Sequence, residues 1–401
     1  MRIALVHDYL AEYGGAERVV EAMHEIWPDA PVYTAFVDWK KLGKHADRFK
    51  SWDIRPSWVQ GFWLIQKLIS PLRFLAPYIW QSFNLSGYDI VITSSGWFIP
   101  RGVKAGRRNS KGDAFKATPL RGLPMQICYI HHPPRNLYGY ATGSNLQKYW
   151  LVRLYTIFVN FFLRNYDFKT AQKVDYFIAN SKETARRVEK FYRRESTVIY
   201  PPISQNSKSE YRNPKQIQNS KLKSENYYLS VGRLSWAKRV DLIIEACNTL
   251  QVPLKIVGIG NEEEALKKIA GPTVEFLGSV SDEELAHLYR NAKALIFTAL
   301  DEDFGMVPVE AMAEGTPVIG LSQGGVKETV IDARSASSGQ GATGVLFDEP
   351  TVRSLTNAIQ RFEKLSKGKD WTRECMKQAE KFSVNVFKRK LSAFVREKLL
   401  S

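Results

Sequence analysis

Two glutamates, Glu302 and Glu310, are separated by seven residues in the segment 301–320, DEDFGMVPVEAMAEGTPVIG. Pro308 favours a short helix between an acidic loop and an apolar strand, and Gly315 suits the left-handed end of that helix. The N-terminus of such a helix offers backbone N–H groups and the positive end of the helix dipole. It could hold phosphates while the two carboxylates accept hydrogen bonds from ribose and sugar hydroxyls. The alternative is a surface acid followed by an acid that only stabilises the first helical turn.

Two cations, Arg233 and Lys238, follow an apolar strand that the sequence predicts over residues 227–231. A guanidinium fork and an ammonium group at this position could neutralise a diphosphate. The alternative is a pair of solvated surface charges. Ligands bind beyond the carboxyl ends of parallel strands, which is where these cations and the two glutamates are expected. Together they could bind the diphosphate, the ribose and the sugar of a sugar nucleotide.

A third polar cluster, His131-His132-Pro133-Pro134-Arg135, directly follows the apolar strand expected over residues 126–130. Its place at the carboxyl end of a strand favours a functional role, although isolated histidines are often structural.

Gly14 and Gly15 lie between a first apolar strand, residues 3–7, and an amphipathic helix. Glycine lets the backbone approach a ligand closely, and the helix N-terminus behind it favours a negative group. The three-glycine dinucleotide fingerprint is absent, so a nicotinamide site is disfavoured. The alternative is a plain tight turn.

Strands and helices alternate in both halves of the chain, which predicts an α/β protein with two doubly wound, Rossmann-like parallel-sheet domains facing a cleft. Residues 204–226 are polar and lack periodicity, as expected of a linker. The predicted organisation is an N-terminal domain over residues 1–204, a linker over 205–226, a C-terminal domain over 227–370, and final helices over 371–401 that could pack back on the first domain.

Composition limits the classes of protein. The 401 residues are 44% hydrophobic and 24% charged, as in ordinary globular proteins. Cys128, Cys247 and Cys375 show no CxxC spacing, so neither a disulfide framework nor a cysteine zinc site is predicted, which fits a reducing compartment. No apolar run is long enough to span a bilayer, and the first residues do not resemble a signal peptide.

The net charge of +16 favours anionic partners, namely nucleic acid, an anionic lipid surface or a phosphorylated substrate. No nucleic-acid-binding module is recognisable. Residues 58–80 and 149–166 are rich in aromatic and aliphatic side chains and are interpreted either as core helices or as helices that dock reversibly on an anionic membrane. Residues 104–122 are basic and glycine-rich and are predicted to form an exposed loop.

The segments VGRLSWAKRVDLIIEA and EDFGMVPVEAMAEGTPVIG resemble the signature blocks of the retaining GT-B glycosyltransferases of family GT4. GGAE at residues 14–17 and SQGGVKETV at 322–330 are similar to two further blocks, the second with lysine in place of proline. YIHHPPRNLY is similar to a block of the mannosyltransferase-like branch that builds bacterial surface polysaccharides, with His132 in place of threonine and Pro134 in place of methionine. Compared with the sequences of that branch, residues 104–122 look like an inserted segment.

The resemblance implies a role for each candidate residue. Arg233, Lys238 and Gly15 would bind the donor diphosphate, and Glu310 would bind the ribose. The implied catalytic residues are His131 and Glu302, and Glu302 would also contact the donor sugar. The remaining implied residues are the donor loop Phe304, Gly305, Met306 and Val307, the base-bordering Val280, and the acceptor-side Gly14 and Arg135. Cations and backbone N–H groups could stabilise the leaving diphosphate, so neither a metal nor another cofactor is expected.

The expected function is the transfer of a hexose with retention of anomeric configuration, and the favoured donor is GDP-mannose. The expected acceptor is a saccharide or a polyprenyl-diphosphate-linked saccharide in cell-surface polysaccharide synthesis. The expected location is the cytoplasm, with peripheral contact at the inner face of the membrane, and no nucleic-acid partner. The alternatives are a glucosyltransferase that uses UDP-glucose, a nucleotide-sugar epimerase or hydrolase, and a nucleic-acid-binding protein.

Overall fold

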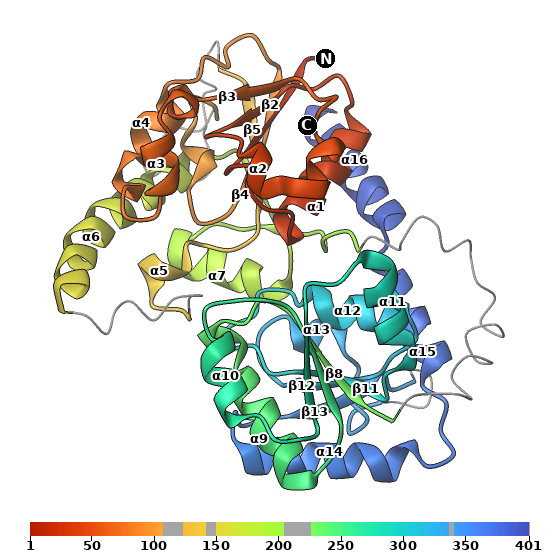
Figure 1. Cartoon of the computed structure of the whole chain (residues 1–401). Coiled ribbons are helices and arrows are strands. Elements are labelled where there is room, and N and C mark those ends of the chain that lie inside the picture. Colours follow the sequence, from red (N-terminus) through yellow and green to blue (C-terminus); the bar gives the residue numbers. More distant parts are fainter. Residues whose placement is uncertain (107–122, 142–149, 204–225, 337–340, 401) are drawn as a thin grey trace. The chain divides into compact units, whose positions relative to one another are not determined.

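A computed structural model of the chain describes residues 1–106, 123–141, 150–203, 226–336 and 341–400. The chain forms two compact units (Figure 1). Unit 1 comprises Met1–Tyr140, Leu146–Pro202 and Phe387–Ser401, and unit 2 comprises Ala141–Asn145 and Ile203–Val386. The predicted linker over 205–226 and most of the predicted loop over 104–122 lie outside the described residues.

Unit 1 is built on a seven-stranded parallel sheet with the order β3-β2-β1-β4-β5-β6-β7. Every neighbouring pair is parallel, so all strands end at one edge of the sheet. The strands are β1 (Ile3–His7), β2 (Val32–Thr34), β3 (Ile54–Pro56), β4 (Ile90–Ser95), β5 (Met125–Ile130), β6 (Tyr176–Ala179) and β7 (Thr197–Val198).

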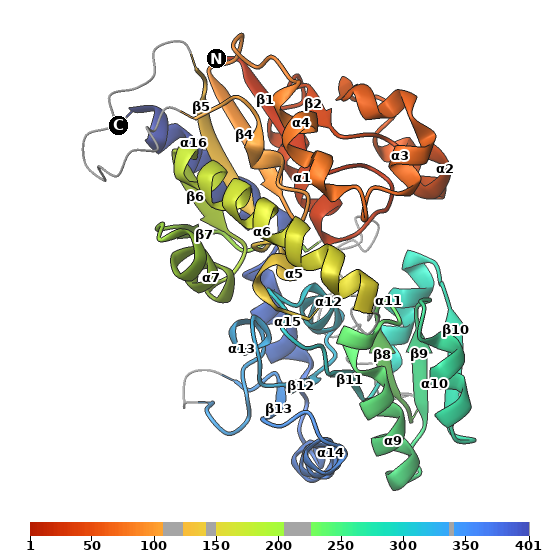
Figure 2. The same cartoon turned by 90° about the vertical axis from the view of Figure 1, so that its left-hand side faces the viewer.

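Helices connect these strands and cover the sheet (Figure 2). Ser181 caps the N-terminus of α7, because its Oγ accepts a hydrogen bond of 2.9 Å from the N–H of Thr184. The α-helices are α1 (Gly15–Ile26), α2 (Trp39–Leu42), α3 (Trp63–Lys67), α4 (Ala76–Gln81), α5 (Arg135–Tyr138), α6 (Trp150–Lys173), α7 (Lys182–Tyr192) and α16 (Val384–Leu400). The short 3-10 helices are η1 (Gly43–Arg48), η2 (Trp58–Gly61), η3 (Arg73–Leu75) and η4 (Pro100–Gly102).

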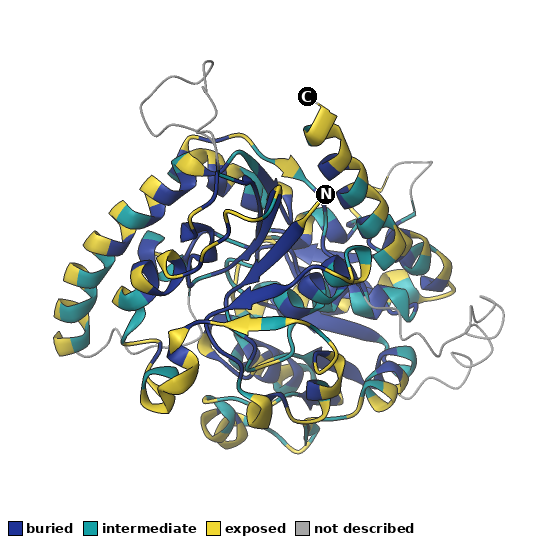
Figure 3. Ribbon diagram, turned by 90° about the horizontal axis from the view of Figure 1, so that it is seen from above, coloured by how far each residue is buried: buried dark blue, intermediate teal, exposed yellow. Residues whose placement is uncertain are grey.

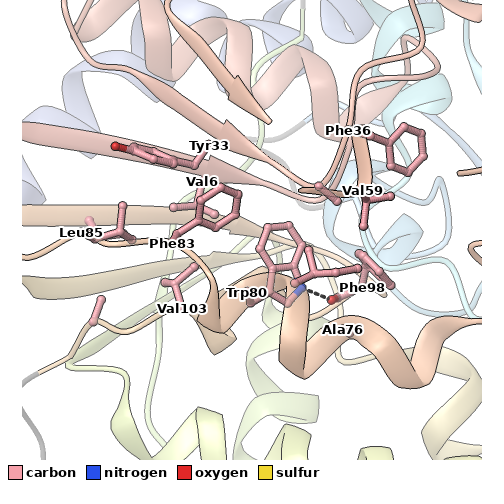
Figure 4. Close-up of a cluster of buried hydrophobic side chains, with 14 of the residues drawn as sticks. Val6, Tyr33, Phe36, Val59, Ala76, Trp80, Phe83, Leu85, Phe98 and Val103 are labelled. Carbon is pink, nitrogen blue, oxygen red and sulfur yellow. Dashed lines mark hydrogen bonds between the residues drawn. The ribbon is translucent and has the colours of Figure 1, made fainter. Parts of the chain in front are cut away.

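The largest side chain in the core of unit 1 is Trp80, which is fully buried (Figure 4). Its indole N–H donates a 2.6 Å hydrogen bond to the carbonyl of Phe98, so burial leaves this donor satisfied. The rings of Phe83 and Phe98 pack against it, and Val59 and Ala76 belong to the same cluster. Part of the 58–80 segment is therefore core, in agreement with one of its two interpretations.

Unit 2 is built on a six-stranded parallel sheet with the order β10-β9-β8-β11-β12-β13. The strands are β8 (Tyr228–Val231), β9 (Leu254–Val257), β10 (Val274–Gly278), β11 (Ala294–Phe297), β12 (Val318–Leu321) and β13 (Gly344–Phe347). The helices are η6 (Trp236–Lys238), α9 (Val240–Leu250), α10 (Glu263–Ile269), α11 (Asp282–Asn291), α12 (Met306–Ala313), α13 (Val326–Thr329), α14 (Val352–Ser366) and α15 (Thr372–Glu380). In both units the central strands are buried, the edge strands β3, β7 and β10 are partly exposed, and most exposed residues lie on helices and loops (Figure 3).

The predicted fold class is confirmed, because each unit is a parallel sheet of the Rossmann-like type. The apolar run of β4 ends at Ile92, yet the strand continues to Ser95. Ser94 pairs with His7 of β1 and Ser95 pairs with Ile130 of β5, so ladder bonds on both sides extend the strand through polar residues.

Residues 58–80 form the short helical pieces η2, α3, η3 and most of α4. Pro71 has no N–H to continue a helix, and the chain turns between α3 and η3. Residues 371–400 are helical as predicted, but they divide between the units. α15 belongs to unit 2, whereas residues from Phe387 onwards belong to unit 1.

The three cysteines are buried and form no disulfide. Among the helices in the described ranges, none combines the length and apolar character that crossing a membrane requires.

Candidate active site

In unit 2, Lys238 and Glu302 come together as an ion pair. The Lys238 ammonium donates a 2.8 Å hydrogen bond to Oε2 of Glu302, and both side chains are partly buried. The pairing follows from sheet order, because β8 and β11 are neighbours and both loops leave the same edge. Thr298 connects the two loops, since its hydroxyl lies within hydrogen-bond distance of the backbone carbonyls of Lys238 (2.8 Å) and Arg239 (3.0 Å) and donates to them.

Glu310 lies in the middle of α12 and accepts a 3.3 Å hydrogen bond from the hydroxyl of Tyr289. Tyr289 is buried in α11, where its backbone carbonyl accepts from the hydroxyl of Thr316. The tyrosine therefore fixes one oxygen of the carboxylate. Sequence reasoning missed Tyr289, because it lies on a different helix and no local motif contains it.

The loop between Glu302 and Glu310 has an unusual backbone. Asp301 has a positive φ of 52° and Gly305 one of 85°, and α12 begins directly afterwards at Met306. A non-glycine residue held in the left-handed region indicates a local constraint of the kind found at functional sites. The predicted donor loop, Phe304 to Val307, is therefore the N-terminal turn of α12. The Phe304 side chain is core, 5.4 Å from the ring of Phe382, so only its backbone could contact a ligand.

Two glycines support this loop from the segment that follows β12. Gly324 has a φ of 59°, and a Cβ on it would lie 2.0 Å from the carbonyl oxygen of Glu302. The N–H of Gly325 donates a 2.9 Å hydrogen bond to that same oxygen. Only glycine permits this close approach of the two backbone segments. The SQGGVKETV segment therefore holds the backbone of Glu302 in place.

The other candidates in unit 2 lie where the predictions expected strand ends. Arg233 is exposed two residues after β8, and Val280 is half-buried two residues after β10. Gly315 has a φ of 78° after α12, which confirms its predicted left-handed conformation.

In unit 1, His131 is one end of a buried polar chain. Its Nε2 lies 2.8 Å from the Ser94 hydroxyl, which lies 3.1 Å from Nδ1 of His7. The other ring nitrogen of His7 is 3.3 Å from Oε1 of Glu17, and Oε2 of Glu17 accepts a 2.9 Å hydrogen bond from the N–H of Gly14. The glycine turn and the histidine cluster, which are more than a hundred residues apart in sequence, are thus joined by hydrogen bonds.

Burial lowers the pKa of His131 well below its ordinary value, with smaller contributions from His7 and His132. The imidazole is therefore neutral at physiological pH, because a charged ring would lose its hydration without a counterion. Burial also raises the pKa of the neighbouring Asp8 to about 6, against the opposing effect of His7. The Asp8 carboxylate accepts two long hydrogen bonds, both 3.5 Å, from the N–H groups of Gly96 and Phe98.

Arg135 and Gly15 complete the unit 1 candidates. Arg135 is half-buried and begins α5 four residues after His131, and Gly15 is the first residue of α1. In the part of the chain that the structure describes, no group of three or more His, Cys, Asp and Glu side chains could hold a metal ion.

Comparison with known proteins agrees with the geometry of unit 2. Residues 212–382 match the family described as glycosyl transferases group 1. An alpha-1,3/1,6-mannosyltransferase of Dictyostelium discoideum is 25% identical over 313 residues, which is 68% of this chain and 70% of that protein. The corresponding enzyme of Candida glabrata is 25% identical over 266 residues, so this chain spans only 56% of its length.

The crystal structure of HepE from Anabaena, in complex with UDP and glucose, superposes with a TM-score of 0.65. The superposition covers 99% of both chains at 19% identity, and at that identity the likeness shows the fold alone. The chain is a glycosyltransferase with the GT-B fold, and its residues 212–382 match the group 1 family of glycosyl transferases.

Proposed function

We propose that this enzyme transfers a hexose from a nucleotide sugar with retention of anomeric configuration, and that the donor is GDP-mannose. The observation that carries the proposal is the Lys238–Glu302 ion pair beside the N-terminal turn of α12, with Glu310 held by Tyr289. The mannosyltransferases among the relatives support mannose, and the UDP and glucose named for HepE support a nucleotide-sugar donor.

The proposed chemistry of unit 2 follows from charge. Departure of a nucleoside diphosphate develops negative charge on its outer phosphate, which positive groups must stabilise. Lys238, Arg233 and the N–H groups of Phe304 to Val307 would supply this stabilisation, so no metal ion is required in the proposal. Glu302 orients the Lys238 ammonium and would accept from a hydroxyl of the donor sugar. Glu310 would accept from the ribose, and Val280 would border the base.

His131 is the proposed catalytic residue of unit 1, together with Gly15 at the reacting phosphate. A neutral imidazole can exchange hydrogen bonds with sugar hydroxyls without placing a second positive charge near the substrate. Because Ser94 contacts Nε2, the other nitrogen, Nδ1, is the one we assign to the sugar. Gly14 and Arg135 are proposed to contact the acceptor.

The proposed acceptor is a saccharide, free or linked to polyprenyl diphosphate, in cell-surface polysaccharide synthesis. The proposed location is the cytoplasmic face of the membrane.

A panel of sugar nucleotides tests the donor. Thermal unfolding of the whole protein would be measured with GDP-mannose, UDP-glucose, UDP-galactose and the free nucleotides, followed by analysis of products with and without a saccharide acceptor. We expect GDP-mannose to raise Tm most and mannose to appear on the acceptor. A larger rise with UDP-glucose would assign the donor to the alternative glucosyltransferase. Release of free sugar at the same rate without acceptor would indicate a hydrolase.

A further inference from the structure

The outward face of α6 is apolar along its first seventeen residues. Side chains that face solvent are normally polar, and a helix buries its apolar stripe against the core. On α6 the large apolar side chains are outside, and each is at least 48% exposed: Trp150, Leu151, Leu154, Ile157, Phe158, Phe161 and Phe162. Their spacing of three, four and seven residues places them on one side of a helix about 25 Å long.

The inward face of α6 carries both apolar and polar side chains, and Leu163 and Ala171 are buried there. Asp167 and Thr170 are buried, and Asn160 is half-buried and accepts a 2.9 Å hydrogen bond from Arg73. The helix therefore has apolar side chains on both its buried and its exposed side, whereas a surface helix normally has a polar exposed face. Packing within unit 1 explains the buried polar groups but not the exposed aromatic ones.

A second exposed apolar set lies on the segment beside α6. The Arg73–Asn160 hydrogen bond and a hydrogen bond from the Tyr155 hydroxyl to the carbonyl of Pro71 join this segment to the helix. Its large exposed side chains are Trp58, Phe62, Trp63, Leu64, Leu68, Phe74 and Tyr78. We call the two sets together the apolar ridge.

Charge around the ridge has a single sign. Residues 58–88 and 150–166 contain no aspartate or glutamate, although the chain has 41 acidic residues. Lys67, Arg153 and Arg164 in these stretches are exposed. Arg153 and Arg164 are eleven residues apart, which is about three helical turns, so both lie along the same side of α6.

We propose that the apolar ridge is the surface by which unit 1 docks on an anionic lipid membrane. Trp, Tyr and Phe prefer the boundary between lipid headgroups and acyl chains, and flanking Lys and Arg are attracted by anionic headgroups. A second copy of this chain would bury the same arginines against each other without acids to pair them, which disfavours self-association. α6 lies in the interface and does not cross it, since Arg153 and Arg164 stay with the headgroups.

This inference concerns binding and does not depend on which sugar is transferred. Its failure and the failure of the proposed function are therefore separable, because one is read from vesicles and the other from donor binding and product.

Vesicle co-sedimentation of the full chain tests the proposal. Vesicles of phosphatidylcholine with about 30% phosphatidylglycerol would be compared with pure phosphatidylcholine at low salt. We expect binding to the mixed vesicles, weakened when salt is raised. The variant Ile157→Ser/Phe158→Ser/Phe161→Ser should lower the partition coefficient at least about tenfold, since three large side chains leave the acyl boundary. Arg153→Glu/Arg164→Glu should abolish the preference for anionic vesicles.

The matched control is Leu365→Ser/Leu400→Ser, which changes exposed leucines outside the ridge (40% and 86% exposed). It should bind as the wild type does. Circular dichroism of every variant checks that the fold is retained. Wild-type binding by the triple variant, or no binding by the wild type, would overturn the proposal. A wild-type dimer that the triple variant loses, without vesicle binding, would assign the ridge to a second copy instead.

Discussion

The hydroxyl of Ser94 lies between two histidine rings, 2.8 Å from His131 and 3.1 Å from His7. Such a hydroxyl sets which imidazole nitrogen carries the proton, because it must donate to one ring and accept from the other. The tautomer of His131 is thus coupled through Ser94 and His7 to the carboxylate of Glu17. Ser94 and His7 are positioning residues for the proposed catalytic histidine.

Removing the Ser94 hydroxyl should slow turnover without weakening the donor complex. For Ser94→Ala we expect kcat to fall about tenfold while the Kd for donor stays within about twofold, and His131→Ala should lower kcat further, by about a hundredfold. Steady-state kinetics and calorimetric titration with donor nucleotide measure the two quantities. Ser82→Ala, at an exposed serine, is the control. Unchanged turnover in Ser94→Ala would remove this residue from the site.

For the proposed donor contacts in unit 2, we expect substitutions to weaken donor binding, unlike the substitutions of Ser94 and His131. Lys238→Ala and Glu310→Ala should each weaken donor binding about tenfold to a hundredfold, since each removes a hydrogen bond to or from a charged group. Isothermal titration measures the affinity, and the thermal unfolding curve shows that the fold survives. Lys267→Ala and Glu314→Ala are matched controls, because these side chains are in ion pairs elsewhere on unit 2. Wild-type affinity in the test variants would refute the assigned contacts.

Asp8 predicts a specific dependence of stability on pH. Burial raises its pKa from 3.8 to about 6, so the folded state keeps this proton up to about pH 6 while an unfolded chain loses it near pH 4. The unfolded state binds fewer protons between these values, so this group lowers the free energy of unfolding as the pH rises through them. In the wild type, this fall in the free energy of unfolding between about pH 4 and pH 6 is of the order of 3 kcal/mol. The variant Asp8→Asn should not show it, because the amide does not titrate.

Urea unfolding at about pH 4 and at pH 7 checks this prediction. The difference in unfolding free energy, variant minus wild type, should increase with pH. Asp47→Asn, at an exposed carboxyl that forms an ion pair with Lys50, is the control variant. A difference that is constant with pH would show that Asp8 does not titrate between folded and unfolded states in this range.

At the scale of elements, α6 is held to the sheet by a buried ion pair. Arg101 of η4 and Asp167 of α6 are both fully buried and hydrogen-bonded to each other. The hydroxyl of Tyr138 donates to the second Asp167 oxygen at 2.7 Å, and Arg101 also donates to the Tyr192 hydroxyl at 2.8 Å. Four elements, namely η4, α5, α6 and α7, therefore meet at one polar cluster.

Loss of Asp167 should destabilise unit 1 strongly. Asp167→Ala leaves the guanidinium of Arg101 buried without its carboxylate, which typically costs about 3–5 kcal/mol. Urea unfolding followed by tryptophan fluorescence measures the change. Asp47→Ala, which breaks an exposed pair, should cost less than about 1 kcal/mol. An equally small effect of Asp167→Ala would mean that the cluster does not contribute to stability.

At the scale of the whole molecule, the end of the chain belongs to unit 1. Phe387, Leu391, Phe394 and Val395 of α16 are buried, and two of them contact strands, with Phe387 5.8 Å from Tyr129 and Phe394 6.2 Å from Tyr176 between ring centroids. Unit 1 is therefore complete only after the last helix has been made, although unit 2 precedes that helix in the chain.

Truncation should distinguish the two units. Removing residues 387–401 exposes four core contacts, each worth about 1.5–3 kcal/mol, so unit 1 should lose its cooperative unfolding transition. Unit 2 should keep its own transition and its affinity for donor nucleotide. Differential scanning calorimetry measures both transitions. Removing residues 399–401 alone, where Leu399 and Leu400 are exposed, should change neither. An unchanged unit 1 transition after the longer truncation would contradict this account of α16.

The sequence by itself determined the features that depend on neighbours in the chain. Apolar runs and βα alternation predicted two parallel-sheet units, and Pro308 and Gly315 predicted where the helix between the two glutamates begins and ends. Lys238 and Glu302 could be assigned to one site because both follow strands of the same half. These are short-range patterns, and steric and hydrogen-bonding rules act on them directly.

Only the tertiary structure decided which distant residues meet. His7, Ser94 and His131 come together because β1, β4 and β5 are adjacent in the sheet, and strand order is not encoded in any local pattern. Tyr289 of α11 contacts Glu310 of α12 because the two helices pack together in the folded unit, and no local pattern encodes that packing. Nor could composition say whether the aromatic stretch of α6 faces core or solvent, since both need the same apolar residues. Packing in unit 1 decided it, because Asp167 is buried against Arg101 with Leu163 and Ala171 buried on the same side, and this fixes which side of α6 faces solvent.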